Sequence, residues 1–385
     1  MKKFIKYILA MSKEPFIPKK AARTTTIILP DKDTTEGIYR SILPSYIING
    51  ADNDLRMLIV GIHEKANVSK NEKDFHITKR LIEETDHFVF PFIAVSLRPI
   101  IEDIKLIKPA MKFSYYIDYN YYLLPESYPF SKEYIQRVEM IEDNIRAVDQ
   151  VIVTNKYLLD YIIEQIQKKY PGETFGTLFR YQRLFISPEL FITDYANEAA
   201  RGKIKALIIA DEYQFSDVNY VLGILKAFKI KYKETFELVL LGWDGKRNEK
   251  NYMKDFPFTY FARVPYSIYF ETIKHIGPNV LIIPATKSKF NDTSKNYIKY
   301  LEFAHLNIPV IAPNILPYSD LITTNENGFL CDEKGAYAFQ LETMFTEPVK
   351  FEGPLGIAYA TASEFNINDP ANIESLKKVY FPEFE

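Results

Sequence analysis

Short apolar, β-branched runs alternate with helix-length amphipathic segments along most of the chain. This alternation is typical of parallel α/β architecture, because helices cover both faces of a parallel sheet and its strands then read as continuous apolar runs. In the first half we expect strands at 24–29, 55–62, 88–93, 112–117, 150–154 and 177–181. Helices are expected between them near 37–49, 73–85, 96–107, 131–147 and 156–169.

The pattern restarts after a polar, small-residue stretch at 193–203, which we interpret as a linker. Strands are expected at 204–210, 236–241, 258–264, 280–284, 309–312 and 328–331, with helices near 217–233, 266–276 and 293–306. A chain of 385 residues also exceeds a comfortable single core. We therefore predict an α/β protein with two Rossmann-like, doubly wound domains that face a central cleft. The predicted divisions are an extension at 1–23, domains at 24–197 and 198–345, and a segment at 346–385 that crosses back to the first domain.

Composition excludes several kinds of site. The formal net charge of -2 gives no global argument for nucleic-acid or membrane binding. With Cys331 as its one cysteine, the chain has neither an internal disulfide nor a cysteine-based metal site, which suits a cytoplasmic protein. The five histidines, at 63, 76, 87, 275 and 305, lack paired ligand spacing, so no metal cofactor is expected. No stretch approaches the ~20 apolar residues of a membrane span. Lys6 interrupts the apolar start, so we expect a short surface helix or a loose membrane-touching segment there rather than a signal peptide.

The most informative segment runs from 290 to 302, between the predicted strands 280–284 and 309–312. Asp292, Thr293 and Ser294 are suitable N-caps for a helix that starts here. Lys295, Lys299 and Glu302 would then form one stripe of that helix, at positions i, i+4 and i+7.

The chemistry of this stripe suits a nucleotide diphosphate. A helix N-terminus attracts phosphate, and a lysine in its first turn adds a cation. The carboxylate of Glu302, two turns further on, could accept hydrogen bonds from ribose hydroxyls. The alternative is a solvated face of charged side chains paired along the helix, which is the commoner role of such stripes.

The segment 280–330 resembles the donor-binding half of retaining GT-B glycosyltransferases. The residues that carry the resemblance are Ile283-Pro284, Phe290-Asn291, Lys295, Lys299, Glu302, Pro309-Val310-Ile311, Pro317-Tyr318 and Asn327-Gly328-Phe329-Leu330. Weaker matches at 116–125, 147–155, 204–217 and 238–242 extend it over most of 110–335. The resemblance implies a nucleotide-sugar co-substrate, no metal and no other cofactor, with Asn291, Ser294, Lys295, Lys299, Glu302 and Tyr318 at the donor. Ser294 departs from the family, since many relatives carry two glutamates separated by seven residues, and counting back from Glu302 places Ser294 at the first.

A second group of residues has weaker support. Gly37 follows the segment 33–36 and could permit close backbone approach after the first strand. Asp118 could line the cleft, Arg180 and Arg183 could reach a diphosphate from the first domain, and Lys226 lies on the first helix of the second domain. Surface or turn positions are the alternative for each of these five.

We thus expect a glycosyltransferase whose acceptor is a glycan, a lipid or a protein or, as a rarer alternative, a modified base in viral DNA. A catalytically inactive nucleotide-sugar or sugar-binding module is the second hypothesis, supported by Ser294. A nicotinamide-dependent dehydrogenase is disfavoured, because no G-x-G-x-x-G motif follows the first strand of either half.

Overall fold

A computed structural model describes residues 22–29, 37–61, 77–92, 95–126, 128, 131–172, 176–191, 204–211, 214–242, 258–332 and 334–383. These residues belong to two compact units, described here separately. Unit 1 comprises Met1–Tyr122, Lys132–Ser187 and Ile367–Glu385, and unit 2 comprises Leu123–Ser131 and Pro188–Asn366. The expected linker at 193–203 and the segment at 1–21 lie outside the described residues.

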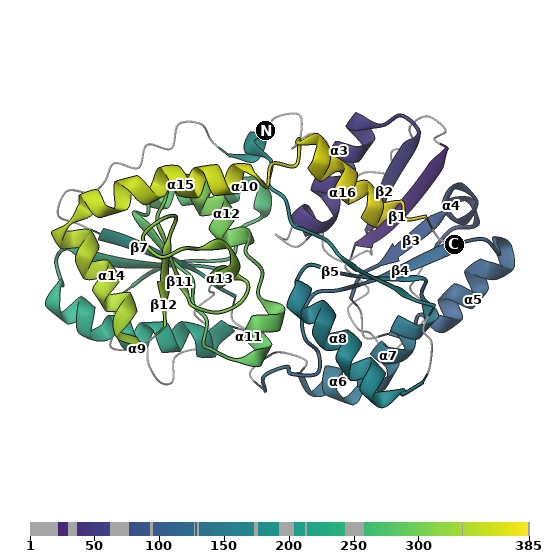
Figure 1. The fold of residues 1–385 in the computed structure, drawn as a ribbon, viewed down its shortest axis with the longest axis horizontal. Helices are drawn as coiled ribbons and strands as arrows, with labels where there is room; N and C mark the ends of the chain where they lie inside the picture. Colours follow the sequence, from purple (N-terminus) through teal and green to yellow (C-terminus); the bar gives the residue numbers. More distant parts are fainter. Residues whose placement is uncertain are drawn as a thin grey trace. The chain divides into compact units, whose positions relative to one another are not determined.

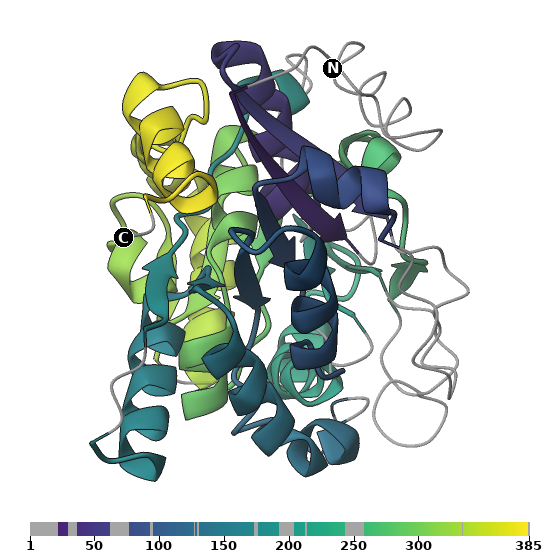
Figure 2. The ribbon, with the colours of Figure 1, turned by 90° about the vertical axis from the view of Figure 1, so that its right-hand side faces the viewer.

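Unit 1 is built on a six-stranded sheet in the order β2-β1-β3-β4-β5-β6, with every adjacent pair parallel. Figure 2 shows its first strands, in purple and dark blue, side by side. The strands are β1 Arg23–Leu29, β2 Leu55–Gly61, β3 His87–Phe90, β4 Lys112–Ile117, β5 Gln150–Val153 and β6 Leu178–Tyr181. The helices are η1 Ile38–Ile42, α3 Leu43–Ala51, α4 Lys79–Glu84, α5 Arg98–Ile107, α6 Ser131–Gln136, α7 Val138–Ala147, α8 Lys156–Lys169 and α16 Pro370–Tyr380.

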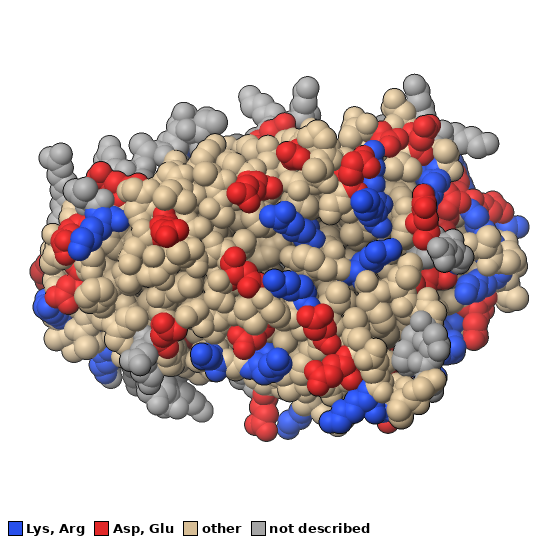
Figure 3. Space-filling model, viewed as in Figure 1, with Lys and Arg blue, Asp and Glu red and all other residues tan. Residues whose placement is uncertain are grey.

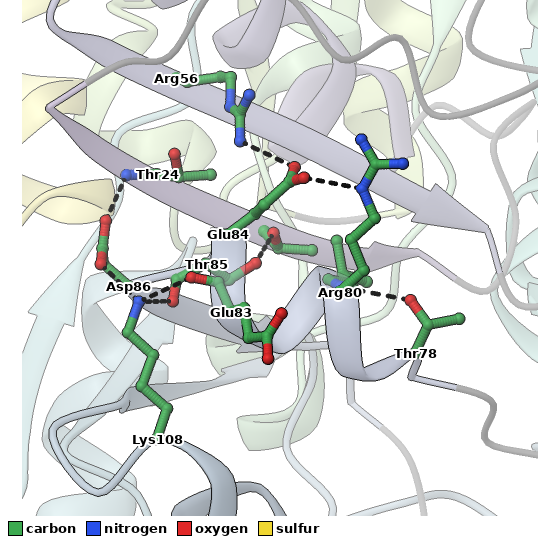
Figure 4. A network of polar contacts seen from close by, with 11 residues as sticks. Thr24, Arg56, Thr78, Arg80, Glu83, Glu84, Thr85, Asp86 and Lys108 are labelled. Atoms are coloured by element: carbon green, nitrogen blue, oxygen red, sulfur yellow. Dashed lines mark hydrogen bonds and ion pairs between the residues drawn. The ribbon is translucent and has the colours of Figure 1, made fainter.

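Polar contacts fix the amino ends of β1 and β3 (Figure 4). The Asp86 carboxylate accepts a hydrogen bond from the Thr24 backbone N–H at 2.8 Å and pairs with the Lys108 ammonium, also at 2.8 Å. Nearby, Glu84 lies 2.9 Å from Arg80 and 3.5 Å from the largely buried Arg56. These contacts join α4 and the end of α5 to the edge of the sheet.

The end of α16 belongs to unit 1 through a buried hydrogen-bonded chain. The carbonyl of Tyr380 accepts from the Thr25 hydroxyl at 2.6 Å and lies 3.0 Å from Nδ1 of His87. His87 Nε2 lies 2.6 Å from the Ser114 hydroxyl, and the Gln150 side chain donates to Ser114 Oγ at 3.2 Å. Polar side chains of β1, β3, β4 and β5 therefore form hydrogen bonds with one another and with the last turn of the helix.

Unit 2 repeats the architecture. Its parallel sheet has the order β12-β11-β10-β7-β8-β9. The strands are β7 Ile204–Ile209, β8 Phe236–Leu241, β9 Thr259–Phe261, β10 Val280–Ile282, β11 Val310–Pro313 and β12 Phe329–Cys331. The helices are η2 Pro188–Leu190, α9 Phe215–Lys231, α10 Tyr266–Ile276, α11 Lys289–Ser294, α12 Ile298–His305, α13 Tyr318–Leu321, α14 Lys334–Thr346, η4 Pro348–Phe351 and α15 Glu352–Ser363.

Helices cover both faces of this second sheet (Figure 1). Helices α9 and α14 pack on one face around a core that contains Val221, Leu225, Phe228 and Leu341. Helices α10, α12 and α15 lie on the other face, where α12 contacts α15. The predicted α/β class with two Rossmann-like sheets is confirmed, and each predicted strand overlaps an observed one. Within the described residues, no helix is both long and apolar enough to cross a membrane.

Candidate ligand-binding site at the carboxyl edge of the second sheet

The strand order of unit 2 defines where a ligand is expected. From β7 the chain proceeds to β8 and β9 on one side, and then returns to place β10 on the other side of β7. Connections therefore leave β7 and β10 in opposite directions, and ligands of doubly wound sheets bind beyond the carboxyl ends of the strands at such a switch point. Helix α9 follows β7 and helix α11 follows β10, so the starts of these two helices border the candidate site.

Asp217, in the first turn of α9, organises this edge. Its Oδ1 accepts hydrogen bonds from the backbone N–H and the hydroxyl of Thr286, each at 2.8 Å, and from the Asn291 amide at 3.1 Å. Asn291 also donates to the Thr286 carbonyl at 2.8 Å. A buried carboxylate needs such partners, and here they join α9 to the loop after β10.

Lys295 brings a positive charge to the same point. Its ammonium lies 3.3 Å from Asp217 Oδ2, and only 13% of the lysine side chain and 9% of the aspartate side chain are exposed. Three donors therefore hold one carboxylate oxygen of Asp217, while a cation contacts the other. The pair combines a rigidly held anion with a cation on a flexible stem.

Two buried tyrosines complete the cluster. Burial, together with the negative charge of Asp217, raises the pKa of Tyr318 well above its usual value. The pKa of Tyr337 is raised for the same main reason, with smaller effects from Cys331, Tyr220, Tyr318 and Asp217. Both phenols are thus protonated, and the charge of Asp217 acts on both. Asp292 fixes the turn before Tyr318 by accepting from the Leu316 N–H at 3.2 Å.

The prediction of one helix over 293–306 is wrong. The structure has two helices here, α11 and α12, and Lys295 lies between them with extended backbone angles (φ -72°, ψ 152°). The Ser288 hydroxyl caps α11 by accepting from the Asn291 N–H, so this helix starts six residues before Lys295. The Asn296 side chain accepts from the Ile298 N–H and starts α12 anew. Lys295 thus precedes a helix instead of lying in its first turn.

Lys299 and Glu302 form a separate buried group with Tyr269 of α10. The Glu302 carboxylate is fully buried and accepts from the Tyr269 hydroxyl and the Lys299 ammonium, each at 3.1 Å. The ammonium also lies 4.4 Å from the centre of the Tyr269 ring. Burial and the charge of Glu302 raise the pKa of Tyr269 far above its usual value. The structure therefore joins α10 to α12 with these side chains and shields Glu302 from solvent.

The remaining candidates in unit 2 lie apart from this cluster or at its margin. Ser294 is half-buried at the end of α11, next to Lys295. Lys226 is exposed on α9, nine residues after Asp217, which is about 13 Å along a helix.

The candidates in unit 1 follow its own strands. Gly37 begins η1 with φ -58°, a conformation open to any residue, and the stretch 33–36 before it lies outside the described residues. Asp118, directly after β4, forms an ion pair with the largely buried Arg40. Arg180 is exposed on β6, and Arg183 is half-buried just beyond that strand.

The sequence pattern missed Thr286 and Tyr337. Thr286 follows β10 and the apolar residues Ile283-Pro284-Ala285 after it, and its position beyond a strand's carboxyl end was the available signal. Tyr337 gave no signal, because an aromatic residue in a helix normally belongs to the core. Among the residues the structure describes, no three His, Cys, Asp or Glu side chains form a metal-binding group.

No protein-family model and no curated protein sequence matches the chain. Solved structures do match it in fold. A sucrose-phosphate synthase from Thermosynechococcus elongatus has a TM-score of 0.63 at 11% identity, over 93% of this chain and 98% of the other. Anabaena HepE in complex with UDP-glucose has a TM-score of 0.62 at 11% identity, over 92% and 99%. A glycosyltransferase from Rickettsia africae has a TM-score of 0.55 at 13% identity, over 93% and 98%. The chain thus has the two-sheet α/β fold of GT-B glycosyltransferases.

Proposed function

We propose that this chain is a glycosyltransferase that moves a sugar from a nucleoside diphosphate sugar to an acceptor. The observation that carries the proposal is the fold likeness to nucleotide-sugar enzymes over nearly the whole chain, HepE with UDP-glucose among them. The Asp217–Lys295 cluster supports it independently, because it places a cation at the switch point of the second sheet. Fold alone does not define a reaction, so both observations are needed.

In the proposed reaction, the bond between the sugar C1 and the diphosphate oxygen breaks, and the diphosphate leaves with the bonding electrons. A bond forms between C1 and an acceptor oxygen, which loses its proton. Lys295 would stabilise the leaving diphosphate, together with the positive end of the α12 dipole three residues later. Asn291, Ser294 and Tyr318 would line the donor around it.

Glu302 was expected to bind the ribose, and we propose a different role for it. Because its carboxylate is fully buried and bonded to Tyr269 and Lys299, Glu302 would orient Lys299 and α12. A direct ribose contact would require the side chain to leave this pair, at the cost of breaking a buried ion pair.

We further propose no requirement for a metal, because Lys295 supplies positive charge at the leaving group, and retention of the anomeric configuration, which the resemblance at 280–330 implies. The acceptor is proposed to be a glycan, a lipid or a protein. On the described part of the face in Figure 3, Lys and Arg side chains alternate with Asp and Glu side chains. This mixture favours a glycan, lipid or protein acceptor over a modified base in DNA, because DNA binding is typical of a continuous basic surface.

One observation favours a second candidate, a catalytically inactive nucleotide-sugar-binding module. Lys295 is already paired with Asp217, and Glu302 is already paired with Lys299. Charged side chains that satisfy one another suit a chain that keeps the fold without turnover.

A donor panel separates these candidates. The protein is incubated with UDP-, GDP- and ADP-sugars, and both melting temperature and released nucleotide are measured. The glycosyltransferase proposal predicts stabilisation by one nucleotide family and slow release of its diphosphate, with the product anomer read by NMR. Stabilisation without release over many protein equivalents would favour the binding module. Neither effect with any donor would contradict both.

A further inference from the structure

We propose that Asp217 is a positioning residue that competes with the donor's diphosphate for Lys295. In the free protein it holds the ammonium at the site, and on binding the ammonium transfers from the carboxylate to a phosphate oxygen. The inference rests on the proposed function, because it takes the incoming anion to be a nucleoside diphosphate.

The carboxylate of Asp217 is the fixed member of this pair. Its Oδ1 accepts three hydrogen bonds from Thr286 and Asn291, and the residue is 6% exposed. Moving it would break the junction between α9 and the loop after β10. Any change of partner must therefore come from the lysine.

Lys295 is the mobile member. It lies between two helices, in the extended residue that follows α11, and its ammonium contacts the outer oxygen Oδ2 at 3.3 Å. A lysine ammonium on a four-carbon stem can reorient without backbone movement, and it binds phosphate as a point charge. Lys295 can therefore change partner while the loop stays in place.

The competition predicts the direction in which the affinity for a diphosphate changes when the charge of Asp217 is removed. A phosphate close enough to contact Lys295 also approaches Asp217, and two anions in a poorly solvated site repel each other. Asp217 thus orients Lys295 but weakens the binding of a dianion. Removing the negative charge alone should tighten diphosphate binding, provided that the loop junction survives.

The alternative is that the Asp217–Lys295 ion pair has a structural role only and stabilises the loop after β10. Asp217→Asn separates the two roles, because its amide oxygen can still accept from Thr286 while its charge is gone. A purely structural role predicts that Asp217→Asn has a lower melting temperature than the wild type and binds the ligand equally or more weakly. The competing role predicts stronger binding that depends on Lys295.

The test is a double-mutant cycle by calorimetry at low salt, with UDP and inorganic diphosphate as probes. The wild type, Asp217→Asn, Lys295→Met and the double variant are compared after their cooperative melting is checked. If Asp217→Asn does not melt cooperatively, Asp217→Ser replaces it, since serine also removes the charge and offers an acceptor. Asp217→Glu, which keeps the charge, is the matched control and should not bind more tightly.

We expect Asp217→Asn to bind either probe roughly tenfold more tightly, and Lys295→Met to bind roughly tenfold more weakly. The gain from Asp217→Asn should vanish in the Lys295→Met background. Binding by Asp217→Asn that equals or falls below the wild type, or a gain that persists without Lys295, would overturn the inference and leave the proposed function standing. No binding of either probe by any variant would contradict the inference, and the donor panel would then decide the function separately.

Discussion

Asp217 joins the start of α9 to Thr286 in the loop after β10 through one carboxylate oxygen, which accepts both the backbone N–H and the hydroxyl of Thr286 at 2.8 Å. The contact spans 69 residues of sequence. It decides where the loop before α11 lies, and hence where Asn291 and Lys295 lie.

Substitutions at the two residues of this contact should lower the free energy of unfolding by different amounts. Thr286→Val removes the hydroxyl that donates to Asp217 and accepts from Asn291 but keeps the backbone N–H bond, and it should lower the free energy of unfolding by about 1 kcal/mol. Asp217→Ala leaves several buried donors and the Lys295 ammonium without their acceptor, so a loss of about 2–4 kcal/mol is expected. Urea unfolding measures both values. Equal, small losses for the two variants would show that Asp217 does not organise the edge.

The buried pair in α12 should matter far more than an exposed pair in the same unit. Glu302→Ala leaves Lys299 and Tyr269 facing a buried gap and should cost about 3–5 kcal/mol. Glu347→Ala is the control, because the Glu347–Lys350 pair is mostly exposed and should contribute less than about 1 kcal/mol. A Glu302→Ala variant as stable as Glu347→Ala would mean that the carboxylate is free for another role.

Unit 1 should lose stability in mild acid because of His87. Burial lowers the pKa of this histidine from its usual 6.5 to about 4. Between these values the unfolded chain binds more protons than the folded one, so stability falls as the pH falls. The contribution is fully present above pH 6.5 and is lost progressively toward pH 4, with a total on the order of 3 kcal/mol.

Urea unfolding at pH 7 and pH 5 measures this effect, with His87→Gln as the comparison. The glutamine variant should be less stable at pH 7, because it disturbs the bonds to Ser114 and Tyr380, but it should lose less between the two pH values. His305, whose pKa burial also lowers, remains in both proteins and cancels in the difference. The same pH-dependent loss in both proteins would exclude His87 as its source.

The single thiol should be unreactive in the folded protein. Cys331 is buried on β12, and burial raises the pKa of its thiol to about 12. Since the thiolate is the reactive form, maleimide labelling at pH 7.5 should be slow in buffer and fast in guanidinium chloride. Mass spectrometry gives both rates. Rapid labelling of the folded protein would show that β12 opens readily or that Cys331 is accessible.

The strands could be predicted because each forms a continuous apolar run, and such a run indicates a strand without reference to distant residues. Runs such as that of β8, Phe236–Leu241, are buried on both faces of a parallel sheet and leave little choice of structure. The repeat of this pattern predicted two Rossmann-like sheets, which the structure confirms.

The helix around Lys295 could not be predicted from the same kind of signal. Neither glycine nor proline marks the break after α11, and the segment carries helix formers and three suitable caps. Tertiary contacts determine where the helix breaks. Asp217 of α9 binds Asn291 and Lys295, and the Asn296 side chain accepts from the first N–H of α12. The burial of Glu302 likewise depends on Tyr269, which lies 33 residues earlier in the chain.

Calorimetric titration of the responsive nucleoside diphosphate into the wild type, Lys295→Ala and Lys274→Ala tests the central claim most directly. Lys274 is an exposed lysine on α10, so its removal changes the net charge equally. We predict that Lys274→Ala binds like the wild type, and that Lys295→Ala binds at least about tenfold more weakly, as expected for a lost charge-assisted phosphate contact. Equal affinity of all three proteins would contradict a diphosphate site at Lys295.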